Sequence, residues 1–204
     1  MTPTEKQFKI WSVLLLITII LSGINPASRT VWALEVALVA ITLFVLYITN
    51  KKFTFSKVAY TLIFIYLILI SIGAHYTYEK VPYEGLKDIL GTERNPYDRI
   101  THFAFGLLVY IPLLEFFVRT SKLKHKFWMY FVPLLIITGA GAIYEIIEWI
   151  VAINVAPDAA QAFLGMQGDI WDAQKDMLFN SLGALVAMFA AMFIRIFKTH
   201  SLEP

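Results

Sequence analysis

Six long apolar runs constrain this chain more than any other feature of its sequence. Each run is near or above the roughly 17 to 25 residues that a helix needs to cross the hydrocarbon of a bilayer. Hydrophobic residues make up 58% of the 204-residue chain, far more than in soluble proteins. We therefore predict an all-α fold, a polytopic membrane bundle of six transmembrane helices in a single domain over residues 1–204. The predicted spans are Phe8–Ile24, Val31–Thr49, Val58–Tyr76, Asp98–Val118, Phe127–Ile153 and Asp172–Phe197.

The distribution of charge predicts how these spans are oriented. Eleven of the seventeen Lys and Arg residues fall on one side of the six-span arrangement, and twelve of the fifteen Asp and Glu residues fall on the other. Because cytoplasmic segments carry an excess of Lys and Arg, both termini are expected in the cytoplasm. The expected location is the bacterial inner membrane. The first run is expected to be a retained anchor, because it is long and no Ala-x-Ala cleavage site follows it.

Composition excludes several classes of function. The chain has no cysteine, which excludes disulfides, thiolate metal sites and a thiol nucleophile. The formal charge of +2 and the absence of a basic stripe argue against nucleic acid as a partner. Membrane lipid is the partner that the apolar runs imply.

Two connections on the acidic side are longer than the others. In Thr77–Tyr97, the segment Tyr83–Leu90 is predicted to form a short helix that lies on the membrane interface. Asn154–Trp171 contains a proline and two glycines around a short apolar stretch, a pattern typical of a loop that dips back toward the bundle. Such a loop is tolerated only where protein or water satisfies its backbone.

The fourth run opens with an Asp and a His that share one helical face. Asp98 and His102 are four residues apart and therefore lie one turn from each other. Asp98 is also a common residue type at a helix N-cap, so a capping aspartate with a hydrogen-bonded histidine is the alternative interpretation. Arg99 beside them could meet an anionic head group.

Two glutamates lie near the end of the fifth run. Glu145 and Glu148 are three residues apart, on one face and close to the expected helix C-terminus. The helix dipole disfavours negative charge at that end, so capping does not account for them. Two carboxylates in this position need a cation, a proton or a shared proton.

The start of the sixth run carries a stripe of acids. If its helix begins near Asp169, then Asp169, Asp172, Asp176 and Asn180 lie on one face. Acids in a first helical turn are ordinary caps, whereas Asp176 and Asn180 are deeper, where a polar group is expected to have a buried partner. His75 ends the third run, close to the same depth.

These residues suggest three roles. Carboxylates with imidazoles form a ligand set that suits Mg²⁺, Mn²⁺ or Zn²⁺. The candidate metal ligands are Asp98, His102, Glu148, Asp172, Asp176 and His75. The candidate catalytic residues are His102, Glu145, Glu148 and Asp176. The candidate substrate-binding residues are Arg99, Asp169 and Asn180.

Motifs in the C-terminal half resemble the YjdF-type family of bacterial inner-membrane proteins. The residues that carry the resemblance are Asn95-Pro96-Tyr97-Asp98-Arg99, His102-Phe103, Gly106, Tyr144-Glu145, Glu148-Trp149, Leu164-Gly165, Gln167-Gly168-Asp169, Trp171-Asp172, Gln174 and Asp176-Met177. The resemblance implies an inner-membrane bundle and names no reaction. A fainter similarity to VanZ-like membrane proteins rests on Asp98, His102-Phe103, a later Glu, and Asp176, Asn180 and Gly183. It hints at an envelope-related role by analogy alone.

Three functions are compatible with these patterns. The first is a metal-assisted hydrolase or transferase that acts on a lipid or an envelope precursor at the extracytoplasmic face. The second is a protein that binds head groups or couples transport to protons or cations. The third is a structural protein whose polar groups only hold helices together.

Overall fold

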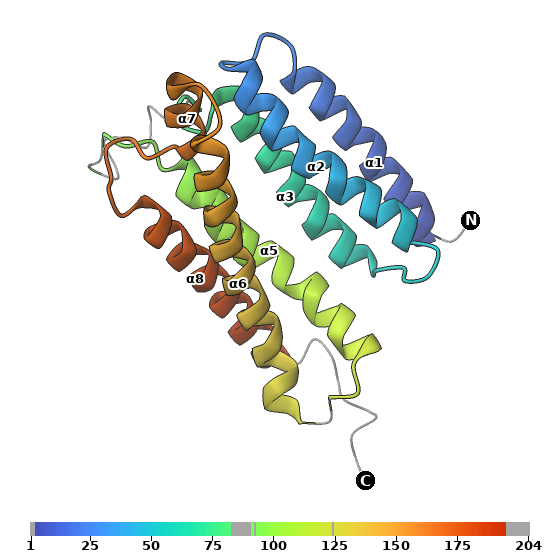
Figure 1. Ribbon diagram of the computed structural model, residues 1–204. Helices are drawn as coiled ribbons and strands as arrows, with labels where there is room; N and C mark the ends of the chain where they lie inside the picture. Colours follow the sequence, from blue (N-terminus) through green and yellow to red (C-terminus); the bar gives the residue numbers. More distant parts are fainter. Residues whose placement is uncertain (1–2, 83–90, 92, 124, 195–204) are drawn as a thin grey trace.

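A computed structural model describes residues 3–82, 91, 93–123 and 125–194 of the protein (Figure 1). The described residues form only helices: α1 (Pro3–Ser22), α2 (Arg29–Thr49), α3 (Lys57–Tyr76), α5 (Tyr97–Thr120), α6 (Lys126–Ala152), α7 (Pro157–Leu164) and α8 (Asp172–Ile194). Five of them, α2, α3, α5, α6 and α8, are long and apolar enough to cross a membrane. The predicted all-α membrane bundle is therefore confirmed.

Helix α1 coincides with the first predicted span but is not one of these five. Its first turns carry Glu5, Lys6 and Lys9, which shorten its uncharged part. Its outer side chains, such as Ile17 and Ile20, are apolar and exposed, and its inner face packs against α3. A sixth crossing therefore stays a prediction.

Local sequence signals account for several helix ends. The Ser56 hydroxyl caps α3 by accepting a hydrogen bond from the Ala59 amide at 3.2 Å. Helix α7 begins with Pro157, and Gly165, the residue after its last residue Leu164, closes the helix in the left-handed conformation with a φ of 60°. Helix α8 begins at Asp172, so Asp169 lies in the turn before it rather than on its first turn. The predicted helix Tyr83–Leu90 and the end of the last predicted span lie outside the described residues.

The long helices form two groups of three (Figure 1). Helices α1, α2 and α3 pack together, as do α5, α6 and α8, and the contact between α3 and α5 joins the groups. Helix α7 contacts both α6 and α2 and so bridges the groups at one end. Helix α1 begins and α8 ends at the opposite end (Figure 1).

The most extensive contact between two helices, that of α5 with α8, depends on two glycines. A Cβ atom on Gly183 would lie 2.1 Å from the Phe103 carbonyl oxygen, and one on Gly106 would lie 2.0 Å from the Asn180 carbonyl oxygen. Small residues allow helix backbones to approach closely in membranes. This contact brings the polar first turns of α5 and α8 together.

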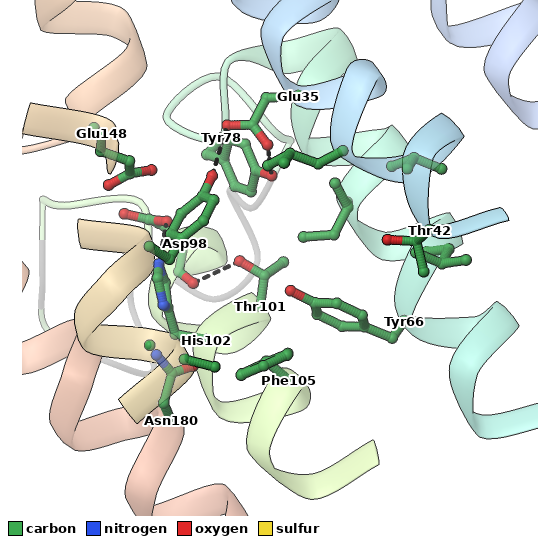
Figure 2. A pocket seen from close by; sticks show the side chains of 18 of the residues that line it. Glu35, Thr42, Tyr66, Tyr78, Asp98, Thr101, His102, Phe105, Glu148 and Asn180 are labelled. Atoms are coloured by element: carbon green, nitrogen blue, oxygen red, sulfur yellow. Dashed lines mark hydrogen bonds and ion pairs between the residues drawn. The ribbon is translucent and has the colours of Figure 1, made fainter. Parts of the chain in front are cut away.

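A cavity of about 210 Å³ lies between the two groups near the α7 end (Figure 2). Its walls come from α2, α3, α5, α6 and α8, and Phe163 and Gly165 of the α7 segment also line it. Phe163 is buried. The Asn154–Trp171 connection therefore does return to the bundle as predicted, although the short helix within it was not predicted.

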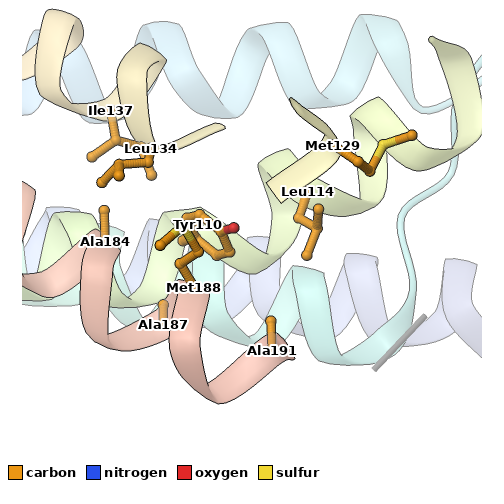
Figure 3. Packing of buried hydrophobic residues seen from close by; sticks show 9 residues of the cluster. All are labelled: Tyr110, Leu114, Met129, Leu134, Ile137, Ala184, Ala187, Met188 and Ala191. Atoms are coloured by element: carbon orange, nitrogen blue, oxygen red, sulfur yellow. The ribbon is translucent and has the colours of Figure 1, made fainter. Parts of the chain in front are cut away.

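The half of the α5–α6–α8 group away from α7 is a packed apolar core (Figure 3). Small alanines of α8 face larger side chains of α5 and α6 there, which lets the three helices pack closely. The buried members are Tyr110, Leu114, Met129, Leu134, Ile137, Ala184, Ala187, Met188 and Ala191.

We predict that Gly183→Ala destabilises the protein by about 1–3 kcal/mol, because the added methyl group overlaps backbone atoms of α5 and forces the helices apart. The matched control is Gly139→Ala in α6, where an added Cβ meets no atom within 4 Å. Thermal unfolding in detergent should show a lower midpoint for Gly183→Ala alone. Equal midpoints for the two variants would contradict the proposed close contact.

Candidate functional site

Two acids and a histidine from α5 and α8 converge at the α7 end of the bundle. Asp98, His102 and Asp176 each offer a ligand atom, and these atoms lie within 4.8 Å of one another. The predicted shared face of Asp98 and His102 is confirmed, with 3.5 Å between the Asp98 Oδ1 and His102 Nε2 atoms. The capping alternative for Asp98 is wrong, because Pro96 is the N-cap of α5. This Asp–His–Asp cluster could hold a metal ion.

Two side chains of α8 carry buried oxygen atoms without a hydrogen-bond partner. Asp176 is 3% exposed and its Oδ1 atom is unpartnered, and Asn180 is 1% exposed with an unpartnered Oδ1 atom. The Asn180 amide nitrogen lies 2.3 Å from the position that a Cβ on Gly141 would take, so the side chain packs closely against α6. Because buried polar atoms in folded proteins almost always have partners, these two oxygens are suited to receive a ligand.

Both predicted glutamates of α6 lie beside the cluster. The Glu145 Oε1 atom is 3.8 Å from the His102 Nε2 atom and is buried without a hydrogen-bond partner. Glu148 is 8% exposed and lines the cavity (Figure 2). Trp149, the residue after Glu148, is exposed on the outside of the bundle. The last turns of α6 therefore add two carboxyl groups to the same site.

Arg94, just before α5, pairs with two of the acids. Its guanidinium lies 3.5 Å from the Asp98 Oδ2 atom, contacts Asp172 more closely, and also donates to the Met166 carbonyl oxygen. Asp172 was predicted as a metal ligand, and the structure places it in this ion pair instead of the Asp–His–Asp cluster. Arg94 thus anchors the chain around the start of α8 to the start of α5.

Arg99 and Asp169, which were predicted to bind substrate, pair with each other next to Lys175. The Lys175 ammonium, 2.6 Å from the Asp169 Oδ2 atom, is the main reason that the pKa of Asp169 falls to about 2, and Arg99 adds to the effect. Asp169 is therefore ionised at neutral pH. Neither Arg99 nor Asp169 is among the described residues that line the cavity. Their geometry is that of an ion-pair network beside the cavity.

The wall of the cavity opposite Asn180 carries a buried glutamate held by two tyrosines. Glu35 of α2 is 1% exposed and accepts hydrogen bonds from the Tyr78 hydroxyl at 2.9 Å and the Tyr144 hydroxyl at 3.2 Å (Figure 2). Gly73 makes room for Tyr78, since a Cβ at Gly73 would lie 2.5 Å from the tyrosine ring. Burial raises the pKa of Tyr78 well above its usual range, so its hydroxyl keeps the proton that it donates.

His75, the remaining predicted metal ligand, is not brought to the Asp–His–Asp cluster. Its Nδ1 atom donates to the Ser22 carbonyl oxygen at 2.8 Å, and its own carbonyl accepts from the Ala27 amide. These bonds tie the end of α3 to the chain between α1 and α2. The structure therefore gives His75 a connecting role at this end of the bundle.

Sequence reasoning assigned no role to Tyr78, Tyr144 or Arg94, and for Glu35 it indicated only a place near His75 and the acids, one turn into the second run. The available signal for Glu35 was an ionisable residue inside an apolar run, which by itself suggests function. The tyrosines had no distinguishing signal, because tyrosines near span ends usually belong to interfacial belts. Arg94 precedes its helix, so helical spacing gave no reason to join it to Asp98.

Comparison with known proteins agrees with this architecture. Residues 8–198 match the family described as predicted membrane protein (DUF2238). The chain belongs to this family. It is also 36% identical over 197 residues to the inner membrane protein YjdF of Escherichia coli (strain K12), with 95% of this chain and 94% of that protein covered. No solved structure matches the chain.

The family membership confirms two predictions from the sequence. The resemblance to YjdF-type proteins, based on motifs of the C-terminal half, extends over nearly the whole chain. The chain is a multi-pass inner-membrane protein, as its relative and its five span-length apolar helices indicate. The residues that carried the resemblance include the Asp–His–Asp cluster, Glu145 and Glu148.

We predict that Arg94→Gln lowers the free energy of unfolding by about 3 kcal/mol, because the largely buried carboxylates of Asp98 and Asp172 lose their nearest guanidinium and Asp172 keeps only Arg99, at 3.8 Å. The matched control is Lys80→Gln, which removes an exposed Lys80–Glu79 pair and should cost less than about 1 kcal/mol. Chemical unfolding in detergent measures both. A loss of stability no greater for Arg94→Gln than for the control would contradict the network.

Proposed function

We propose that the protein is a metal-assisted hydrolase or transferase that acts on a lipid or an envelope precursor. The observation that carries the proposal is the convergence of Asp98, His102 and Asp176 beside a cavity inside a membrane bundle. Ionisable groups are costly at this depth, and they persist where they have a partner or a function. Membership of an inner-membrane family fits a substrate that is held in or at the membrane.

The donor atoms of the cluster favour Zn²⁺ or Mn²⁺ over Mg²⁺. One imidazole nitrogen and two carboxylates form a mixed, borderline donor set, whereas Mg²⁺ takes oxygen ligands and keeps several waters. Three protein ligands leave a coordination position open for water or substrate, as in catalytic sites. A bound ion would polarise a phosphoryl or acyl oxygen and lower the pKa of a bound water.

The remaining carboxyl groups supply the proton transfers that such chemistry needs. In hydrolysis, the oxygen of water bonds to the phosphoryl or acyl centre, its proton passes to a carboxylate, and the leaving group departs with a proton. Glu145 is the candidate base because its Oε1 atom is buried, unpartnered and 3.8 Å from His102. Glu148 lines the cavity and is the candidate acid, and Asn180 offers its Oδ1 atom to the substrate.

The proposal places the α7 end of the bundle outside the cytoplasm. Eleven of the seventeen Lys and Arg residues of the sequence fall on the opposite side of the predicted spans, which supports six crossings with both termini inside. Helix α1 would then be the first crossing, with its charged start at the cytoplasmic surface. The site would open toward the compartment that holds envelope precursors.

Proton- or cation-coupled transport is the alternative. A conducting path needs polar groups across the whole bundle. The described half of the α5–α6–α8 group beyond the site is instead filled by the apolar core of Figure 3, where the Tyr110 hydroxyl is bonded to the Tyr130 carbonyl oxygen. The structure thus offers a polar cavity at one end of the bundle and an apolar core beyond it, which favours catalysis or binding over conduction.

We predict that the purified protein binds about one Mn²⁺ or Zn²⁺ ion, and that Asp176→Asn weakens this binding by about 10- to 100-fold because a charged ligand is lost. The signal of free Mn²⁺ in electron paramagnetic resonance measures the affinity, and elemental analysis measures Zn²⁺. Asp158→Asn, which changes an exposed acid of α7, is the control and should bind like the wild type.

Two results would overturn the metal site. One is a wild-type protein that binds neither ion. The other is equal binding by wild type, Asp176→Asn and His102→Ala, which would mean that the ion sits elsewhere. Unfolding midpoints of each variant separate loss of a ligand from loss of the fold.

We predict that the α7 end is accessible from outside the cytoplasm. The chain has no cysteine, so one introduced thiol reports a single position. In intact cells, a membrane-impermeant maleimide should label Asp158→Cys in α7 and should label Lys122→Cys, between α5 and α6, only after the membrane is opened. Labelling of Lys122→Cys alone in intact cells would mean that the α7 end faces the cytoplasm. Labelling of both variants in intact cells would also contradict the proposed orientation.

A further inference from the structure

The cavity has a second polar wall that the metal chemistry does not use. Glu35 faces it from the side opposite Asn180 (Figure 2) and accepts hydrogen bonds from the hydroxyls of Tyr78 and Tyr144, which also line the cavity. We propose that this cavity binds an organic ammonium group, with Glu35 as its counter-ion. This inference names the chemistry of the substrate at the same site, and it rests on the proposed function in taking the cavity as the substrate site.

The charge of the lining selects a cation. Glu35, Asp98 and Glu148 are carboxyl residues of the lining, His102 is its imidazole, and no Lys or Arg is among the described residues that form it. A divalent ion on the Asp–His–Asp cluster would neutralise Asp98 together with Asp176, but it would leave Glu35 and Glu148 uncompensated. At short range in a low-dielectric site, these carboxylates repel anions and attract cations.

Glu35 keeps acceptor capacity that its tyrosines do not use. Each of its oxygens accepts one tyrosine hydroxyl, from Tyr78 and from Tyr144. A carboxylate offers about four lone-pair positions, so about two remain for a donor such as an ammonium group. The Asn180 Oδ1 atom, which is buried and unpartnered, is a further acceptor on the same cavity.

Aromatic rings complete an environment suited to an alkylammonium group. Tyr66, Tyr78, Tyr144, Phe105 and Phe163 all line the cavity. The faces of aromatic rings attract organic cations, most strongly where the group is removed from water. The rings also give the carbon atoms of such a ligand an apolar surface. A small inorganic cation would make no use of them.

The ammonium group can belong to a lipid or to a soluble amine. Helix α2 packs against α1, α3 and α7, whereas within the described residues it meets α6 through the Tyr144–Glu35 hydrogen bond and not through close backbone contact. Leu38 of α2 lines the cavity and is also exposed on the outer surface, while Ala140 of α6 lines it from the other side. Leu38 and Ala140 therefore mark the side, between α2 and α6, from which an amine-bearing head group enters in this proposal.

The test uses the full chain purified in detergent. Native mass spectrometry compares retention of phosphatidylethanolamine and phosphatidylglycerol with identical acyl chains, and calorimetry measures the binding of ethanolamine. We expect retention of the amine lipid at least about tenfold over the anionic lipid, and we expect Glu35→Gln to remove the preference because the charged hydrogen bond is lost. If ethanolamine binding depends on Glu35 but the protein shows no lipid preference, the ammonium site is supported and its ligand is a soluble amine.

Two control variants keep the result interpretable. Glu115→Gln changes another buried glutamate, which pairs with Arg119 at the far end of the bundle, and should leave amine binding unchanged. Tyr78→Phe removes one hydrogen bond to Glu35 but keeps the ring, so it should weaken amine binding less than Glu35→Gln does. Unfolding midpoints of all variants establish that each is folded.

The proposal is overturned if the wild type binds neither the amine lipid in preference nor ethanolamine, or if folded Glu35→Gln binds them as the wild type does. The second result would mean that Glu35 only links α2 to Tyr78 and Tyr144. Mn²⁺ binding is measured on the same wild-type sample, with and without a chelator. Amine binding without Mn²⁺ or Zn²⁺ binding would refute the metal-assisted function alone, and metal binding without amine binding would refute this inference alone.

Discussion

The contact between α5 and α8 is the constraint on which the rest of the site depends. Gly106 and Gly183 leave no room for a side chain, so the two helix backbones meet directly. Asp98 and His102 lie one to two turns before Gly106, and Asp176 lies two turns before Gly183. Close backbone contact at the glycines therefore determines how closely the side chains of the Asp–His–Asp cluster approach one another. Without it, three costly polar groups would lie in an apolar bundle with no common partner.

The acids at this end of the bundle divide into two sets by their partners. Asp169 and Asp172 are paired with Arg94, Arg99 and Lys175, and this network ties the start of α8 to the start of α5. A second set lies deeper, and within the described residues its members form no ion pair with Lys or Arg: Glu35, Glu145, Glu148 and Asp176. The first set is suited to holding the fold, whereas the second is suited to meeting a cation, a proton or a substrate.

Much of the fold followed from hydropathy. The predicted spans that became α2, α3, α5 and α6 begin and end within two residues of those helices, because an apolar run in a membrane must be helical to satisfy its backbone. The shared face of Asp98 and His102 followed from helical spacing. Helix α7 could not be predicted from helical spacing, because its eight residues are too few to show a period. The last predicted span begins at Asp172, as α8 does, but the stripe of acids was drawn for a helix that begins near Asp169, because acids on both sides of the boundary hid the turn there.

The sequence by itself determined that the chain is an all-helical membrane protein, and it collected the acids and histidines near one end of the spans. Only the tertiary structure decided which of them meet. It placed Asp176 with Asp98 and His102, assigned Asp172 and Asp169 to arginines, left His75 apart, and set Glu35 against two tyrosines. The physical reason is that hydropathy fixes the depth of a residue in a bilayer, whereas helix rotation and pairing depend on contacts such as Gly106 against α8 that a single apolar pattern does not encode.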